Sequence, residues 1–165
     1  LDQEAFGAIV RFLRQHRNQV PKITWFLPVD VPIHDQMIDP EIDVQLKSKM
    51  MLKVVDFKRA FESRSYPSDL EGEVVIDLRA DPTSPWNEGQ WRLRWRDGRV
   101  RVQKGKSTRS PATLRTDIQT MAIAYSGRQN ASLLAASGRL EGSRAAVEIL
   151  DRAFPRNVPY IDEWF

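Results

Sequence analysis

The chain contains no cysteine and only two histidines among its 165 residues. Without thiols it can form neither a disulfide nor a thiolate metal site. Two histidines are too few for a histidine-rich metal centre, so we expect no metal ligands. The sequence also lacks an apolar run near the roughly 20 residues that cross a bilayer, and it lacks a signal-peptide pattern at the N-terminus. We therefore expect a cytoplasmic protein with no membrane partner.

Charge of either sign is not extreme. Lys and Arg number 25 and Asp and Glu number 22, which gives a formal net charge of +3. Such a mildly basic balance does not identify a partner. Hydrophobic residues make up 41% and charged residues 28% of the chain, as in ordinary globular proteins. The length predicts one domain, or one domain plus a piece of another.

The clearest motif is a β-hairpin in the run WRLRWRDGRVRVQ, residues 91–103. Asp97-Gly98 lies between two strictly alternating runs, which is typical of a two-residue type I′ turn. This loop length fixes the register and places Arg96 opposite Arg99. Side chains alternate between faces, so one face of the hairpin is apolar and predicts a core wall. The apolar face carries Trp91, Leu93, Trp95, Val100 and Val102, and the other face carries Arg92, Arg94, Arg96, Arg99 and Arg101.

The arginine face of the hairpin needs counter-charges, because like charges directly opposite each other destabilise a strand pair. A strand predicted over Glu73–Arg79 supplies Glu73 and Asp77 if it pairs beside the hairpin. A basic stripe is also the footprint of nucleic-acid binding. No aromatic residue is interleaved on this face for base stacking, however. We interpret it as a mixed-charge surface and expect no nucleic-acid partner, with binding to DNA or RNA as the alternative to test.

Residues 1–27 predict a helix from Asp2 to about Arg17 and a strand at Lys22–Leu27. One helix and one strand cannot close a core, so we interpret this stretch as the trailing end of a preceding domain. Residues 28–48 contain three prolines and predict a linker.

Residues 49–165 predict an α+β domain, because the strands form one block with helices around it. The predicted elements are a strand at Lys49–Val55, a helix capped by Asp56, the strands at Glu73–Arg79 and in the hairpin, a short strand at Ala112–Arg115, and three further helices, one capped by Thr116, one at Asn130–Ser137 and one capped by Ser143. Gly127 is the predicted stop of the first of these three helices. We expect Trp86, in the turn-rich run 81–89, to fold back over the core or to line a pocket.

Several runs together resemble a known family: MMLKVVDFKRAFESRSYP (50–67), WNEGQWRLRWRDGRV (86–100), LRTDIQTMAIAYSG (114–127), LLAASGRL (133–140) and a short aromatic C-terminus. In order and spacing they are similar to the C-terminal region of Eis-like acetyltransferases, which are multidomain members of the GCN5-related N-acetyltransferase superfamily. The resemblance covers residues 49–165. It implies a sterol-carrier-protein-like fold: a mostly antiparallel sheet with a central hairpin and helices on one face. Residues 1–27 resemble the end of the preceding acetyltransferase-like domain.

The resemblance implies transfer of an acetyl group from acetyl-CoA to a small-molecule amine, aminoglycosides being the best-known substrates of some members. In the family the cofactor is bound by the N-terminal domain, through an R/Q-x-x-G-x-G/A loop that this sequence lacks. We therefore expect no cofactor-binding residue here and no activity of this part alone. The implied partners are the preceding acetyltransferase domains of the same chain and further copies in a homo-oligomer.

The resemblance also gives the last residue a catalytic role. In the family the terminal carboxylate acts as base on the substrate amine, and here that carboxylate belongs to Phe165. Enclosure by Trp164 would raise its pKa by desolvation, and Asp162 and Glu163 would attract a polycationic substrate. Trp86 is a further candidate for the substrate pocket. Other members have an acidic residue where this chain has Trp164, which leaves the substrate class open.

Two alternatives accompany this interpretation. The aromatic C-terminus can instead pack into the core as ordinary hydrophobic residues. A sterol-carrier-like fold also predicts a carrier of lipids or other apolar ligands. The apolar hairpin face and Met50, Met51 and Met121, flexible residues that suit adaptable pockets, are the sequence basis for that function.

Overall fold

The computed structural model describes residues 3–31, 33, 42–47, 50–79, 81–105 and 112–161. The chain forms two compact units, Leu1–Val31 and Pro32–Phe165. The first contains one helix, α1 (Gln3–Gln15). The second contains, in order, α2 (Phe57–Glu62), β1 (Gly72–Arg79), the 3-10 turn η2 (Pro85–Asn87), β2 (Gly89–Arg96), β3 (Arg99–Lys104), β4 (Thr113–Asp117), α3 (Ile118–Ser126), α4 (Ala131–Ala136), β5 (Glu141–Gly142) and α5 (Arg144–Ala153).

The first unit buries none of the side chains of α1. Phe12 is 58% exposed, and Ile23 and Phe26 beyond the helix are also exposed. The strand predicted at Lys22–Leu27 is wrong, because these residues pair with no other strand among the described residues. A β-forming sequence becomes a strand only where a neighbour supplies the hydrogen bonds. The division into residues 1–27, 28–48 and 49–165 stays a prediction.

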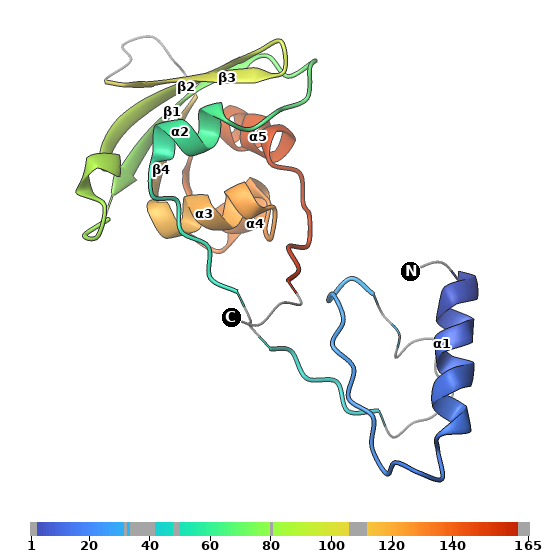
Figure 1. Ribbon diagram of the computed structural model, residues 1–165. Helices are drawn as coiled ribbons and strands as arrows, with labels where there is room; N and C mark the ends of the chain where they lie inside the picture. The colour runs from blue at the N-terminus through green and yellow to red at the C-terminus, as the bar shows by residue number, and fades with distance from the viewer. Residues whose placement is uncertain are drawn as a thin grey trace. The chain divides into compact units, whose positions relative to one another are not determined.

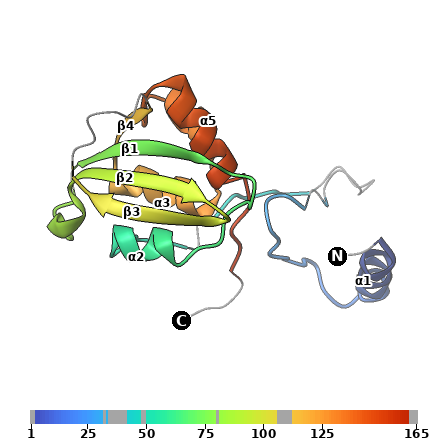
Figure 2. The ribbon, with the colours of Figure 1, turned by 90° about the horizontal axis from the view of Figure 1, so that it is seen from above.

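The second unit is built on a five-stranded sheet in the order β3-β2-β1-β4-β5. Its strand pairs are antiparallel except β1 with β4, which are parallel. The helices of this unit lie on one side of the sheet, as Figure 1 shows, and α3 lies behind the strands when the sheet is seen from above (Figure 2). The α+β class, the mostly antiparallel sheet and the one-sided helices are thereby confirmed.

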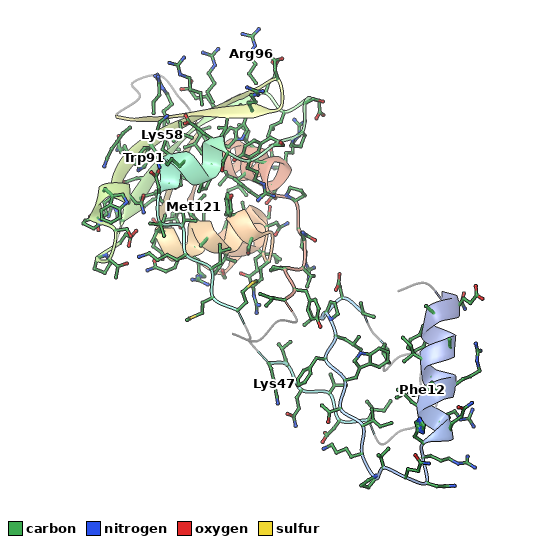
Figure 3. The ribbon with its side chains drawn as sticks, viewed as in Figure 1. Phe12, Lys47, Lys58, Trp91, Arg96 and Met121 are labelled. Carbon is green, nitrogen blue, oxygen red and sulfur yellow. The ribbon has the colours of Figure 1, made fainter. Side chains whose placement is uncertain are left out.

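The hairpin of β2 and β3 has the predicted register, with Arg96 opposite Arg99 and Trp95 opposite Val100. Both turn residues have positive φ, 51° at Asp97 and 72° at Gly98, as a type I′ turn requires. Arg96 projects from the sheet away from the helices, whereas Trp91 and Met121 lie between sheet and helices (Figure 3).

The space between sheet and helices is filled by apolar side chains. The largest of them are fully buried: Trp95, Phe57, Phe61, Phe154, Leu70, Ile76, Leu93, Met121, Leu134, Leu140, Leu150 and Val74. Each such side chain contributes about 1.5–3 kcal/mol on burial, whereas an exposed ion pair contributes about 0–1 kcal/mol. The core, not the charged face of the sheet, therefore holds this unit together.

Acidic residues lie among the arginines of the open sheet face, as predicted. Glu73 of β1 is directly opposite Arg94 of β2. Asp77 of β1 pairs with Arg79 at 3.0 Å and with Arg115 of β4 at 3.7 Å. The face is thus a mixed-charge surface in which β1 separates the hairpin arginines from Arg115 of β4.

The outer edge of β3 is covered by side chains of α2. Glu62 accepts a hydrogen bond from the backbone N–H of Val102 at 2.9 Å, and Lys58 donates to the carbonyl of Val102 at 3.0 Å. The two side chains also pair with each other at 2.6 Å. Burial acts to raise the pKa of Glu62, but these hydrogen bonds and the charges of Lys58 and Arg101 outweigh it and lower the pKa. The pair thus replaces a neighbouring strand at an edge that is otherwise open to pairing with other chains.

Two predicted details near the helices are wrong. No strand forms at Lys49–Val55 among the described residues, because the carbonyls of Val54 and Val55 accept hydrogen bonds from a side chain, that of Asn87, instead. The cap of α3 is Asp117, which accepts from the N–H of Thr120 at 2.6 Å, and not Thr116. The Thr116 hydroxyl donates to the carbonyl of Arg139 at 3.0 Å, a contact that local sequence does not encode.

Replacing Glu62 by Ala removes the acceptor of the Val102 N–H, and we expect it to lower the free energy of unfolding by about 1–3 kcal/mol. Glu148→Ala is the matched control, because Glu148 forms the same i,i+4 type of pair with Arg144 but is exposed; we expect it to cost about 0.3–0.5 kcal/mol. Urea unfolding of both variants measures the difference. Equal losses of unfolding free energy in the two variants would show that the contact with the edge of β3 does not stabilise the domain.

Candidate functional site

Four of the five residues that the sequence assigns to the site, Asp162, Glu163, Trp164 and Phe165, lie outside the described residues. The fifth, Trp86, is 57% exposed at the tip of the 81–88 loop, so the expectation that it folds over the core is wrong. Its indole N–H donates to the carbonyl of Val55 at 2.9 Å, and its own carbonyl accepts from Lys104 at 2.8 Å. These contacts fix the residue while leaving much of its ring open to solvent.

Asn87 ties the 81–88 loop to the segment that enters α2. Its side-chain oxygen accepts from the N–H of Phe57 at 2.9 Å, which satisfies the first donor of the helix. Its side-chain nitrogen donates to the carbonyls of Val54 and Val55 and, at 3.0 Å, to Asp81. Asn87 is only 1% exposed, and its bonds to Phe57, Val54 and Asp81 are buried, whereas the bond to Val55 is partly buried.

Asp81 completes this network from inside the loop. Its carboxylate is 2% exposed and accepts from the N–H of Ser84 at 3.0 Å and the hydroxyl of Thr83 at 3.1 Å. Burial acts to raise the pKa of Asp81, but the hydrogen bonds from Asn87, Thr83 and Ser84 and the charge of Lys53 at 3.8 Å outweigh it. The pKa therefore lies below its ordinary value and the charged form is the one held in the loop.

A surface cleft of about 410 Å³ lies beside this network. Residues 52–56, which lead into α2, form one wall with Leu52 and Val55, and α2 forms another with Arg59 and Ala60. Tyr125 from the last turn of α3 also lines it, and its hydroxyl donates to the carbonyl of Ala60 at 3.2 Å. The cleft thus combines an apolar wall with a rim that carries Lys53, Asp56 and Arg59.

The C-terminal tail, from Phe154 onward, starts next to Tyr125 of the cleft. The ring of Phe154 is fully buried against Phe61, Tyr66 and Tyr125. The guanidinium of Arg64 lies 5.2 Å from the ring centres of both Tyr125 and Phe154, and it donates to the carbonyl of Tyr125. The base of the tail is therefore held by aromatic packing and a cation–π contact.

The tail then crosses the end of α3. The N–H of Asn157 donates to the carbonyl of Gly127 at 2.8 Å. Gly127 is the left-handed cap of α3, with φ 77°, as the predicted helix stop requires. The tail therefore runs along this helix end before it reaches the residues outside the described part of the chain.

Two features of the described residues bear on metal and cofactor binding. These residues contain no group of three metal-ligating side chains. The run Arg94–Gly98, the nearest to a phosphate-binding loop, is a hairpin turn followed by β3 and not by a helix, so it offers no helix N-terminus for a pyrophosphate. In the same part of the chain, no helix has the length and apolar character to cross a bilayer.

Two known domain families match successive parts of this chain. A sterol carrier protein domain matches residues 57–162, and an acetyltransferase (GNAT) domain matches residues 1–54. The chain belongs to the sterol carrier protein domain family. Residues 1–54 match an acetyltransferase (GNAT) domain, and the two matches together confirm the resemblance to the C-terminal region of the GCN5-related N-acetyltransferases.

The similar proteins include several that are described as acetyltransferases. An uncharacterized N-acetyltransferase of Streptomyces avermitilis is 30% identical over 62% of this chain and 24% of its own length. A GCN5-related N-acetyltransferase of Anabaena variabilis is 25% identical, with a TM-score of 0.72 over 90% of this chain and 37% of that one. Eis1 of Mycobacterium abscessus shares the fold, at 22% identity and a TM-score of 0.63 over 84% of this chain and 34% of its own. The chain thus spans about a quarter to a little over a third of these relatives.

Sequence reasoning missed the contacts that shape this side of the sterol carrier protein domain. Asn87 lies next to Trp86 in a loop, and no periodicity separates it from an ordinary turn residue. Arg64 is one of several arginines without a helical or strand pattern around it. Gly127 was expected as a helix stop, but its contact with Asn157 joins residues 30 positions apart. Only the fold brings these groups together.

The network around Asp81 predicts a specific pH dependence. Because the folded-state pKa is lowered, the contribution of Asp81 is complete above its unfolded pKa of about 3.9 and is lost as the pH falls through the folded value. We expect Asp81→Asn to lower the free energy of unfolding near pH 7 by about 1–3 kcal/mol. Below pH 4 the difference from wild type should shrink. Urea unfolding between pH 3 and 7 measures this difference in unfolding free energy, with the exposed Asp69→Asn as control. A difference that does not change with pH would contradict a lowered pKa of Asp81.

Proposed function

We propose that this chain is the C-terminal part of an acetyl-CoA-dependent N-acetyltransferase that acts on amine substrates. One observation carries the proposal: the Anabaena variabilis acetyltransferase aligns with 90% of this chain, across both units. The acetyltransferase match on residues 1–54 and the sterol carrier protein match on residues 57–162 give the same succession. In this proposal acetyl-CoA is bound upstream of the sterol carrier protein domain, on the side where the acetyltransferase match lies.

In this proposal the carboxylate of Phe165 is the general base. A protonated amine must lose a proton before its nitrogen can attack the thioester carbon of acetyl-CoA. A carboxylate within hydrogen-bond reach can accept that proton. A free α-carboxyl has a pKa of about 3.3–3.7, which is low for a base that works near neutrality. Enclosure by Trp164 raises it by desolvation in this mechanism.

The other proposed site residues attract and orient the substrate. Asp162 and Glu163 add two negative charges close to the terminal carboxylate, and a polycationic amine, such as an aminoglycoside, is drawn to such a group. Trp86 contributes an exposed ring whose position is fixed by its bond to Val55. We also propose that the complete enzyme is a homo-oligomer.

A carboxylate at the chain end gives a direct test. Adding a few residues beyond Phe165 in the full-length enzyme removes the carboxylate from its position without changing any side chain. We expect kcat to fall by about 10²–10⁴-fold, the usual contribution of a general base, with the KM for acetyl-CoA unchanged. The same extension placed at the N-terminus is the control. An extended enzyme that turns over at the wild-type rate would eliminate the carboxylate as the base.

A carrier of apolar ligands is the second candidate, because the family match is to a sterol carrier protein domain. The described interior argues against it. A hollow for a lipid would leave its apolar walls accessible to water, whereas Leu93, Met121, Leu134 and Leu150 are all 0% exposed. Met51, one of the methionines that suggested a pocket, is 100% exposed.

Ligand titration separates the two functions. With a filled interior, we expect a fluorescent fatty acid at micromolar concentration to show no saturable binding to this chain, because entry would require displacing packed side chains. A carrier would bind it stoichiometrically. Saturable binding, weakened by a larger side chain such as Ala122→Phe in α3, would support the carrier function.

A further inference from the structure

The contact between the C-terminal tail and the end of α3 is a close backbone-to-backbone approach. Besides the hydrogen bond from Asn157 to Gly127, a Cβ on Gly127 would lie 2.9 Å from the nitrogen of Asn157 and 3.0 Å from both its Cβ and the carbonyl oxygen of Pro155. These atoms belong to the main chain or its first side-chain carbon, so none of them can rotate away. Only glycine lets the tail lie this close to α3.

A second glycine in the same conformation lacks this contact. Gly138 follows α4 with φ 72°, almost the value of 77° at Gly127. A Cβ on Gly138 would meet no atom within 4 Å. The two glycines therefore share the conformational requirement of a helix end, and only Gly127 also holds the tail. The contact is a property of the tail and not of helix termination.

The tail is held at two places before it leaves the described residues. Phe154 is locked in the core by its aromatic neighbours and by Arg64. Three residues later the Gly127–Asn157 contact fixes the backbone a second time. Because Phe154 and Asn157 are both held, the position and the direction of the tail between them are fixed. Phe165 is the eighth residue after Asn157, and a chain of eight residues spans at most about 26–29 Å.

We propose that Gly127 is a positioning residue for the terminal carboxylate: by holding Asn157, it determines where the tail departs and hence where the carboxylate of Phe165 can reach. This inference rests on the proposed role of that carboxylate. Gly127 itself contacts neither substrate nor cofactor in this arrangement. Its effect on turnover passes entirely through the backbone of the tail.

Tryptic cleavage tests the contact independently of activity. Trypsin cuts after Arg156, at the peptide bond whose N–H is bound to Gly127. This bond must leave the end of α3 before trypsin can cleave it, so the cleavage rate reports how often the Gly127–Asn157 contact opens. In the full-length protein we expect Gly127→Ala to accelerate cleavage at Arg156 at least tenfold over wild type. Gly138→Ala, which carries the same backbone penalty without the contact, should leave that rate unchanged.

Turnover tests the positioning role. A reacting group misplaced by about 1 Å can cost about 10²-fold in rate, so we expect Gly127→Ala to lower kcat of the full-length enzyme by about that factor. The KM for acetyl-CoA should stay unchanged, and Gly138→Ala should keep wild-type kcat. If Gly127→Ala does not fold, Asn157→Pro, which removes the donated N–H from the tail side, carries the same expectation for kcat.

The outcomes separate this inference from the proposed function. Equal cleavage rates or equal kcat values for Gly127→Ala and Gly138→Ala would overturn the inference, because only the helix-end conformation would then matter. If extension beyond Phe165 abolishes turnover while Gly127→Ala retains it, the positioning role alone fails. If extension leaves turnover intact, the carboxylate role fails, and the positioning role fails with it even where cleavage at Arg156 is faster.

Discussion

Burial of the apolar face of the β2–β3 hairpin is the interaction on which the rest of the domain depends. Trp91, Leu93, Trp95, Val100 and Val102 form the wall against which the helices pack, and none is more than 7% exposed. The Asp97-Gly98 turn fixes the register that presents them together. A slip by one residue would turn five arginines into the core, where unpaired charges are far too costly. The charged open face is thus the necessary counterpart of the apolar one.

Contacts between residues distant in sequence hold α2, the first helix of the domain, in place. Lys58 and Glu62 of α2 cover the edge of β3 through Val102. Asn87 fixes the start of the same helix from the opposite side. Helix α2 has only six residues, too few to be stable alone in water. It forms because its first N–H and the side chains of Lys58 and Glu62 are bound by other elements, and this places the cleft beside Tyr125.

The sequence was informative wherever structure is decided by neighbours along the chain. The hairpin register, the caps Asp56 and Ser143, and the stop at Gly127 follow from local chemistry and were predicted. Predictions failed where a distant partner decides. Lys49–Val55 has the composition of a strand, but its carbonyls are bound by the side chain of Asn87. For the site, local chemistry identified a helix stop, and only the fold revealed the contact that Asn157 makes there.

The sterol carrier protein fold is compatible with the proposed acetyltransferase function because that function does not require a hollow interior. A carrier needs a hollow interior, and here Met121, Leu134 and Phe154 fill the space between sheet and helices. A filled core is rigid, since close-packed side chains resist displacement. Rigidity is what a base at the end of a chain requires, because the loss of a few ångströms in reach removes it from the substrate. The same packing gives the C-terminal tail a fixed point of departure at Phe154.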